Sequence, residues 1–172
     1  MLVSLRHGSA WVLTACLVLA APGCLERKPD SAPGEREAVV QKVIDGDTIE
    51  LADGTRVRYI GIDTPEVHRR EGEGWVLDPQ PFAEEAWQFN RALVERRTVR
   101  LVFDREREDV YDRLLAYVYL KDGTFVNDEL VARGLARVRV IPPNSRFADD
   151  LLKSEAEARR QGAGLWSSEG DG

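Results

Sequence analysis

Short apolar runs separated by tight-turn residues constrain the fold of this chain more strongly than any other feature. Asp53-Gly54 lies between two such runs and is the strongest two-residue hairpin signal in the sequence. Asp45-Gly46 marks an earlier turn of the same kind. Strands this short, joined by turns this tight, predict a small curled sheet or a barrel.

The spacing of apolar residues along the rest of the chain predicts further strands and three helices. The expected extended segments are 39–44, 48–51, 56–62, 99–103, 114–120 and 135–141. The expected helices are 81–95, 126–133 and a last helix that is capped by Asn144 or Ser145 and ends near Gln161. Leu165 and Trp166 are expected to fold back on the core. The sequence therefore predicts an α+β, mainly β fold, a five-stranded OB-type barrel with about three helices.

Two charged stretches show neither the helical nor the strand spacing of apolar residues. Residues 67–79 contain glycine and show no repeat of apolar positions, so we predict a mobile surface loop there. Residues 104–113 form a second charged connection, between two expected strands.

The first 24 residues differ in composition from the rest of the chain. Arg6 and His7 precede an uncharged apolar run at residues 10–21, which is too short for a membrane span and is typical of the core of an export signal. We therefore predict an export signal at residues 1–23, followed by a flexible tether at residues 24–37, which are polar and contain proline and glycine.

The end of this leader resembles a bacterial lipoprotein signal, with Cys24 as the lipidated residue. Two alternatives remain open. A segment that ends at Cys16 matches the lipoprotein signal more closely, but cleavage there would leave a very short apolar core. Cleavage after Ala20 without lipidation would instead release the protein. The expectation is a cell-envelope lipoprotein or a secreted protein, and any membrane contact would be made through the anchor at Cys24 alone.

The remaining chain is long enough for one domain, predicted at residues 38–168, with a tail at 169–172. Both cysteines, Cys16 and Cys24, lie in the leader, so this domain depends on packing and not on a disulfide. The net charge of −6 gives no global steering towards nucleic acid, so any attraction for phosphate has to be local. No feature indicates an oligomer, and a monomer is the default expectation.

A few residues within this domain suggest chemistry. Asp47 and Asp63 offer the carboxylate oxygens that a hard cation such as calcium prefers, and there is no Cys or His cluster for zinc. Arg58 and Arg113 offer planar guanidinium groups that suit a phosphate. Together they suit metal-assisted hydrolysis of a phosphodiester. Taken singly, an Asp-Gly-Asp is more often a turn and a lone arginine more often a solvated side chain.

The order of three segments resembles the thermonuclease family, the staphylococcal-nuclease-like domains. The segments are Asp45-Gly46-Asp47-Thr48, Arg58 through Asp63-Thr64-Pro65-Glu66, and Tyr111-Asp112-Arg113. The likeness runs from about residue 39 to residue 166. The resemblance implies an OB-type fold and calcium bound by Asp47, Asp63 and the backbone carbonyl of Thr64.

The same resemblance implies roles for four further residues. Glu66 would position or deprotonate the attacking water, while Arg58 and Arg113 would bind the phosphate and act in catalysis. Tyr111 matches a tyrosine near the substrate. His68, close by, matches no functional residue of the family and is expected to lie in the surface loop.

The sequence departs from the family pattern in two places. Asp112 stands where the best-known pattern has glycine, next to the second arginine. Residues 137–143 replace a stretch that carries nucleotide-stacking tyrosines in the best-known member. The chemistry is therefore expected to be retained while affinity or base preference changes, and Arg137 and Arg139 are candidates for phosphate contacts in place of stacking.

The spacing of Arg58 and Asp63 poses a geometric problem. A regular strand would separate residues five apart by about 16 Å and would turn them to opposite faces. They can share a site only if the strand bends or ends between them, and Gly61 is the obvious place for a bulge.

The leading hypothesis is an exported, calcium-dependent nuclease that hydrolyses DNA and RNA with little sequence specificity and leaves 3′-phosphate ends. A catalytically silent OB-type module that binds nucleic acid at the cell envelope is the main alternative. A third interpretation is a lipoprotein whose barrel binds sugars or peptides and whose carboxylates hold a structural calcium ion.

Overall fold

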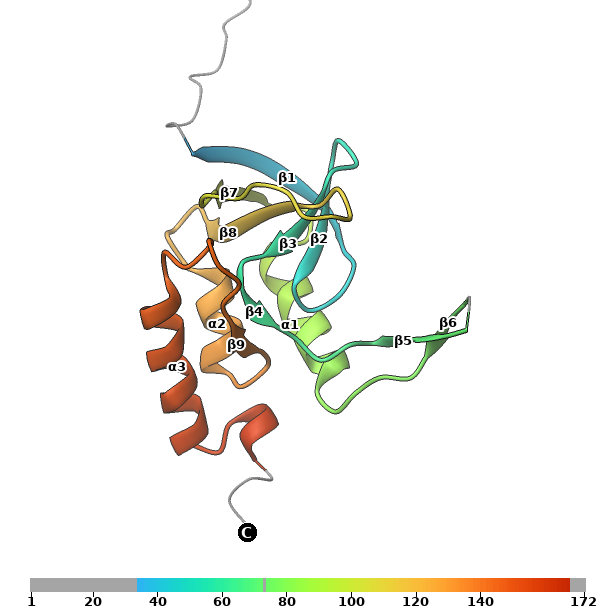
Figure 1. The fold of residues 1–172 in the computed structure, drawn as a ribbon, viewed down its shortest axis with the longest axis vertical. Coiled ribbons are helices and arrows are strands. Elements are labelled where there is room, and N and C mark those ends of the chain that lie inside the picture. The colour runs from blue at the N-terminus through green and yellow to red at the C-terminus, as the bar shows by residue number, and fades with distance from the viewer. Residues whose placement is uncertain (1–33, 73, 168–172) are drawn as a thin grey trace, which may run out of the picture.

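A closed barrel of five strands forms the centre of the protein, as the computed structural model, which describes residues 34–72 and 74–167, shows (Figure 1). The strands pair in the order β1-β2-β3-β8-β7, with β3 and β8 parallel and the other neighbours antiparallel. Their bounds are β1 (Glu35–Val43), β2 (Thr48–Leu51), β3 (Arg56–Tyr59), β7 (Thr98–Val102) and β8 (Leu114–Leu120). This confirms the predicted mainly β barrel.

Two helices pack against the barrel, and a third packs against the second of them (Figure 1). They are α1 (Ala83–Val94), α2 (Val126–Ala132) and α3 (Ala148–Arg160), and a short 3₁₀ helix, η1 (Gly164–Trp166), follows. Trp166 is buried, as its predicted return to the core requires. The core between barrel and helices consists mainly of aliphatic side chains, among them Ile49, Leu51, Leu101 and Leu130.

A two-stranded sheet lies beside the barrel and positions half of the candidate site. It pairs β4 (Gly61–Asp63) with β9 (Arg137–Arg139) in antiparallel register. Gly61 has a φ of +81°, which an L side chain rarely adopts, and a Cβ there would lie 2.8 Å from Leu151 Cδ1. The strand β3 therefore ends at Tyr59 and the chain turns before Asp63, at the glycine where a bend was predicted.

The prediction of an irregular loop at residues 67–79 was wrong. This stretch contains a hairpin of β5 (His68–Glu71) and β6 (Gly74–Leu77), which projects away from the barrel (Figure 1). Its sequence lacks the alternation of apolar and polar residues by which strands are recognised, so the period of the sequence did not reveal it.

Two boundaries also differ from the prediction. β1 begins at Glu35 and pairs with β7 from that residue on, so residues 35–37 belong to the barrel and not to the tether predicted at 24–37. The helix α3 begins at Ala148 without a side-chain cap, so Asn144 and Ser145 are not its N-cap. The side chain of Asn144 instead bonds both the N–H and the carbonyl oxygen of Glu106.

The predicted export signal, Cys24 and the tail at 169–172 lie outside the described residues. Within residues 34–72 and 74–167, none of the helices has the length and apolar character needed to cross a membrane.

Candidate active site

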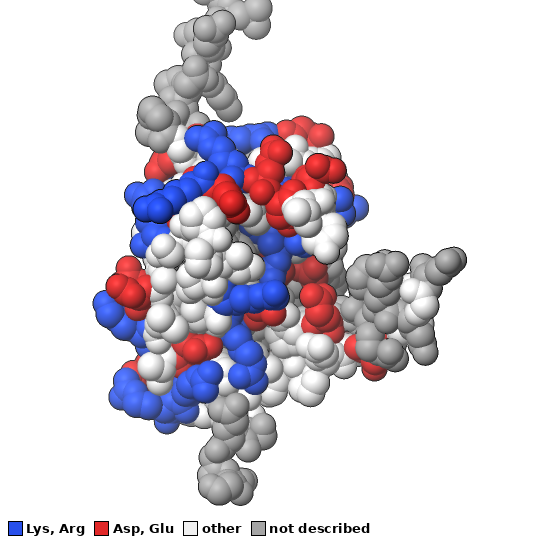
Figure 2. Space-filling model, viewed as in Figure 1, with Lys and Arg blue, Asp and Glu red and all other residues white. Residues whose placement is uncertain are grey.

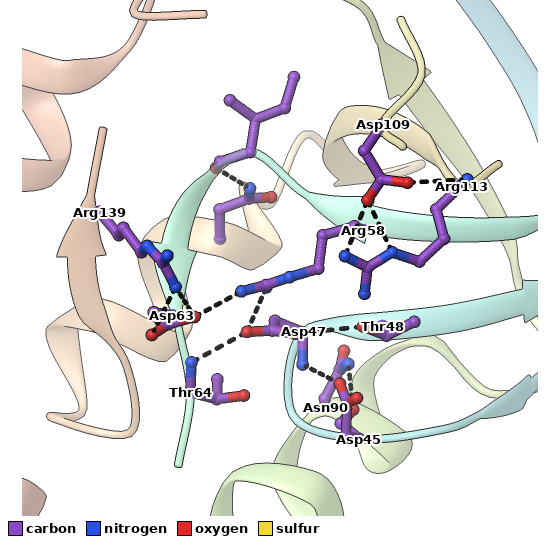
Figure 3. A network of polar contacts seen from close by, with 12 residues as sticks. Asp45, Asp47, Thr48, Arg58, Asp63, Thr64, Asn90, Asp109, Arg113 and Arg139 are labelled. Atoms are coloured by element: carbon purple, nitrogen blue, oxygen red, sulfur yellow. Dashed lines mark hydrogen bonds and ion pairs between the residues drawn. The ribbon is translucent and has the colours of Figure 1, made fainter. Parts of the chain in front are cut away.

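Two carboxylates converge on one guanidinium group beside the barrel. Arg58, on β3, donates from Nη2 to Asp63 Oδ1 at 2.6 Å and forms an ion pair with Asp47 through Nη1 (Figure 3). Asp47 lies in the turn before β2 and Asp63 ends β4, so two strands and this turn contribute to the cluster. The contact between Arg58 and Asp63 replaces the separation of about 16 Å that a straight strand would impose, because the chain turns at Gly61.

Asp47 is held in place by its own turn and by the exit from β4. Its backbone N–H donates to Asp45 Oδ1 at 3.0 Å, and its Oδ2 accepts the N–H of Thr64 at 2.9 Å. The turn and Thr64 approach each other closely, since a Cβ on Gly46 would lie 2.6 Å from Thr64 Oγ1. Burial raises the pKa of the Asp47 carboxyl group, Arg58 opposes this and Asp45 adds to it.

A buried network links this turn to α1. Tyr59 Oη donates to Asn90 Oδ1 at 2.9 Å, and Asn90 Nδ2 donates to the carbonyl oxygen of Asp45 at 3.4 Å. Tyr59 and Asn90 are both fully or almost fully buried. The sequence reasoning missed Asn90, although its position four residues after Ala86 places it on the buried face of the helix and so signals a role for a polar residue there.

Removing this support is expected to destabilise the protein. Asn90→Ala should lower the free energy of unfolding by about 2 kcal/mol, because it strips an acceptor from the buried Tyr59 hydroxyl and a donor from Asp45. Tyr59→Phe should cost only about 1 kcal/mol. Urea unfolding of both variants and of the double variant measures the coupling, and strictly additive losses would show that the two side chains do not act as a pair.

Glu66 lies just after β4, at the edge of the same cluster. Its N–H donates to Gln80 Oε1 at 3.2 Å, and its carbonyl oxygen accepts the N–H of Gln80 at 3.0 Å, so the backbone is fixed while the residue stays exposed. Loss of hydration raises the pKa of the Glu66 carboxyl group; Asp47 and Asp63 raise it further, and Arg58 and Arg113 oppose them. Glu66 is therefore electrostatically coupled to four of the other six predicted site residues.

Arg113 is held by Asp109, a residue that the sequence reasoning missed. Arg113 donates from Nε and Nη2 to Asp109 Oδ2 at 2.8 and 2.7 Å. Asp109 Oδ1 accepts the backbone N–H groups of Tyr111 and Arg113 at 2.9 and 3.1 Å. Partial burial acts to raise the pKa of Asp109, but these bonds outweigh it and lower that pKa. The signal in the sequence was an aspartate four residues before the arginine, at the start of a turn.

Tyr111 and Asp112 occupy the turn that leads to Arg113. The Tyr111 ring is exposed, and its centroid lies 5.4 Å from Arg113 Cζ. Tyr111, the predicted substrate-binding residue, therefore lies beside Arg113. Asp112 has a φ of +57°, in the left-handed region. Aspartate adopts this region more readily than most residues, which explains how it can stand where the family pattern has glycine.

The donor set fits a hard divalent cation. The carboxylates of Asp47 and Asp63 already point at one positive group, and carboxylate oxygens are the ligands that calcium prefers. Within the described part of the chain there is no group of three or more His, Cys, Asp or Glu side chains that could hold a metal ion. Such an ion would therefore need waters, backbone oxygen or substrate to complete its shell. The structure shows Thr64 bonded to Asp47 through its N–H, beside this position.

Comparison with known proteins places the chain in a family. Residues 56–168 match the model of the staphylococcal nuclease homologue family. The thermonuclease of Staphylococcus intermedius is 39% identical over 131 residues, which are 74% of each chain. The thermonuclease of Staphylococcus hyicus is 33% identical over 165 residues, covering 91% of this chain and 94% of that one.

A longer relative contains the same region as part of a larger protein. The SPbeta prophage-derived endonuclease YokF of Bacillus subtilis is 38% identical over 139 residues, covering 78% of this chain and 45% of that protein. The chain thus spans less than half of the length of this relative. The match of the family model and the identities to the two thermonucleases establish that the chain belongs to the staphylococcal nuclease homologue family.

Proposed function

We propose that this protein is a calcium-dependent nuclease that hydrolyses phosphodiester bonds of DNA and RNA with little sequence specificity and leaves 3′-phosphate ends. The observation that carries the proposal is the convergence of Asp47 and Asp63 on Arg58, within electrostatic reach of Glu66. The names of the relatives, thermonuclease and endonuclease, support the same reaction. We also propose that the protein acts as a monomer after export, either anchored through Cys24 or released.

The carboxylates of Asp47 and Asp63, with the carbonyl of Thr64, would hold the calcium ion. When bound, it would supply positive charge that polarises the phosphate and orients the reacting groups. Arg58 and the calcium ion would share the carboxylates of Asp47 and Asp63. With the ion bound, the contacts of Arg58 to these carboxylates would weaken, and its N–H donors would turn towards the phosphate. The protein supplies few charged ligands, so calcium affinity is expected in the range of about 10⁻⁴–10⁻³ M.

The side chains divide the remaining work. Glu66 orients the attacking water and accepts its proton, for which it must be ionised. Arg58 and Arg113 bind the phosphate oxygens and stabilise the charge that gathers on them and on the leaving oxygen. Asp109 keeps the Arg113 guanidinium oriented before the substrate arrives.

The products test this proposal. The protein is mixed with single-stranded DNA, double-stranded DNA and RNA in calcium, and the ends of the fragments are identified by mass spectrometry. Degradation of all three with 3′-phosphate ends is expected. Fragments with 5′-phosphate ends would show that the opposite bond is cleaved, and binding without cleavage would favour a silent nucleic-acid-binding module.

The pH dependence of hydrolysis should follow Glu66. Because the pKa of this carboxyl group is raised, kcat/KM should begin to fall at a higher pH than an ordinary glutamate would cause, as Glu66 takes up its proton. A nearby cation stabilises the carboxylate, so increasing calcium should move this acid limb to lower pH. Profiles of kcat/KM against pH at low and at saturating calcium test this prediction. If the acid limb lies at the same pH at both calcium concentrations, the titrating group is not Glu66.

A further inference from the structure

We propose that Arg139 is a third phosphate-binding residue, which holds a phosphate next to the scissile one on the Asp63 side of the site. This inference rests on the proposed nuclease function and names the substrate as a strand with several phosphates. It adds a contact to a flanking phosphate, whereas Arg58 and Arg113 bind the scissile phosphate.

The position of Arg139 is fixed by the sheet beside the barrel. Arg139 ends β9 and pairs in register with Gly61 of β4. Its Nη1 lies 3.3 Å from both carboxylate oxygens of Asp63 (Figure 3). A guanidinium group carries five N–H donors, and the bonds to Asp63 use Nη1, so further donors can bind an anion. The side chain is 60% exposed, against 15% for Arg58, so a phosphate of a strand can reach it from solvent.

Arg137, two residues earlier on the same strand, is differently placed. Its guanidinium carbon lies 4.1 Å from the centroid of the Trp166 ring, on which it stacks. Both arginines are exposed members of β9. The sequence made them equal candidates for phosphate contacts. In the structure the guanidinium of Arg139 bonds the Asp63 carboxylate, whereas that of Arg137 stacks on Trp166.

The charges around Asp63 favour an anion there once the cation is bound. Asp63 faces two guanidinium groups, those of Arg58 and Arg139. A divalent cation on the two carboxylates would weaken both ion pairs and raise the local positive charge, which a phosphate can offset.

The arginines also lie in an order that suits a strand. Figure 3 shows Arg139 and Arg113 on opposite sides of Arg58. Figure 2 shows several separate patches of Lys and Arg down the middle of this face, with acidic side chains between and beside them, in a protein that is acidic as a whole. A nucleic-acid strand that places its scissile phosphate at Arg58 and Arg113 would carry a flanking phosphate towards Arg139.

Binding measurements on the full-length chain test this inference. Arg139→Ala, Arg139→Lys and the matched control Arg137→Ala are each made in a Glu66→Gln background, so that the ligand is not consumed. The probes are a fluorescein-labelled single-stranded oligonucleotide, read by anisotropy at several salt concentrations, and the dinucleotide TpT as a competitor with a single phosphodiester. Calcium is kept at a concentration that saturates each variant, as determined by titration.

Arg139→Ala should weaken binding of the oligonucleotide about tenfold and reduce the slope of log K against log salt by about 0.7. Its effect on TpT should be less than twofold. Arg139→Lys should restore the salt slope and part of the affinity, whereas Arg137→Ala should change the affinity much less than Arg139→Ala. Equal losses in Arg137→Ala and Arg139→Ala, an unchanged affinity in Arg139→Ala, or an equal loss for TpT would each overturn the inference.

Hydrolysis by the chain with Glu66 intact separates this inference from the proposed function. Cleavage with no effect of Arg139→Ala on binding refutes the inference alone. Binding that depends on Arg139 in a protein that cleaves nothing refutes the nuclease and leaves the phosphate contact standing. A folded protein that binds no oligonucleotide refutes both.

Discussion

Glu66→Gln is expected to reduce the rate of hydrolysis by about 10²–10⁴-fold, the range for loss of a general base. Glutamine has the same shape and can still touch a water molecule, but it cannot take a proton from it. Its backbone contacts to Gln80 are unaffected, so the fold and the binding of nucleic acid should be retained. Initial rates on single-stranded DNA in calcium measure the effect.

The control for this substitution is Glu84→Gln, an exposed glutamate on α1 whose side chain contacts Gln88. It removes the same charge from the protein and should leave the rate unchanged. A Glu66→Gln variant that hydrolyses DNA as fast as the parent would mean that Glu66 does not handle the water.

Arg58→Ala should produce opposite effects on stability and on calcium affinity. Without calcium, the loss leaves the buried Asp47 carboxyl group without its cation, at a cost on the order of 3 kcal/mol. Arg58 also competes with the metal for Asp47 and Asp63, so its removal should tighten calcium binding and enlarge the stabilisation by calcium. Hydrolysis should still fall by about 10²–10³-fold, because a phosphate ligand is lost.

Urea unfolding with chelator and with calcium, together with calcium titration by calorimetry, measures these effects. Arg58→Lys is the matched variant, since it keeps a positive charge but not the planar fork that contacts two carboxylates. It should recover part of the stability without recovering the rate. Calcium binding that weakens in Arg58→Ala would contradict the placement of the ion on the two carboxylates.

The barrel and its helices could be predicted because their residues carry local signals. Asp53-Gly54 lies in the connection between β2 and β3, as its turn chemistry indicates. The alternating run that became β8 and the apolar spacing of α1 reflect faces that are buried in the core. The β5–β6 hairpin has a charged sequence without alternating apolar residues, so it gave no such signal.

The candidate site could be predicted only as a set of residues. The sequence permitted Arg58 to meet Asp63, but the contact depends on the positive φ of Gly61, which spacing alone does not reveal. The supporting residues were harder to find, because their partners are distant in the chain. Asn90 acts on a turn 45 residues earlier.

Distant partners also explain why two motifs were read incompletely. Asn144 has the residue type of a helix cap, yet its amide bonds to Glu106, which no local pattern indicates. Arg137 and Arg139 are alike in sequence, and they differ because the guanidinium of Arg137 stacks on Trp166 while that of Arg139 bonds the Asp63 carboxylate.

The most direct test of the central claim is the rate of nucleic-acid hydrolysis in calcium, in magnesium and in chelator, measured for the parent protein and for Arg113→Ala. Rapid hydrolysis in calcium, its loss in chelator, and a fall of about 10²–10³-fold in Arg113→Ala would agree with a calcium-dependent site built on these residues. Intact DNA and RNA under every condition, from a protein shown to be folded, would contradict it.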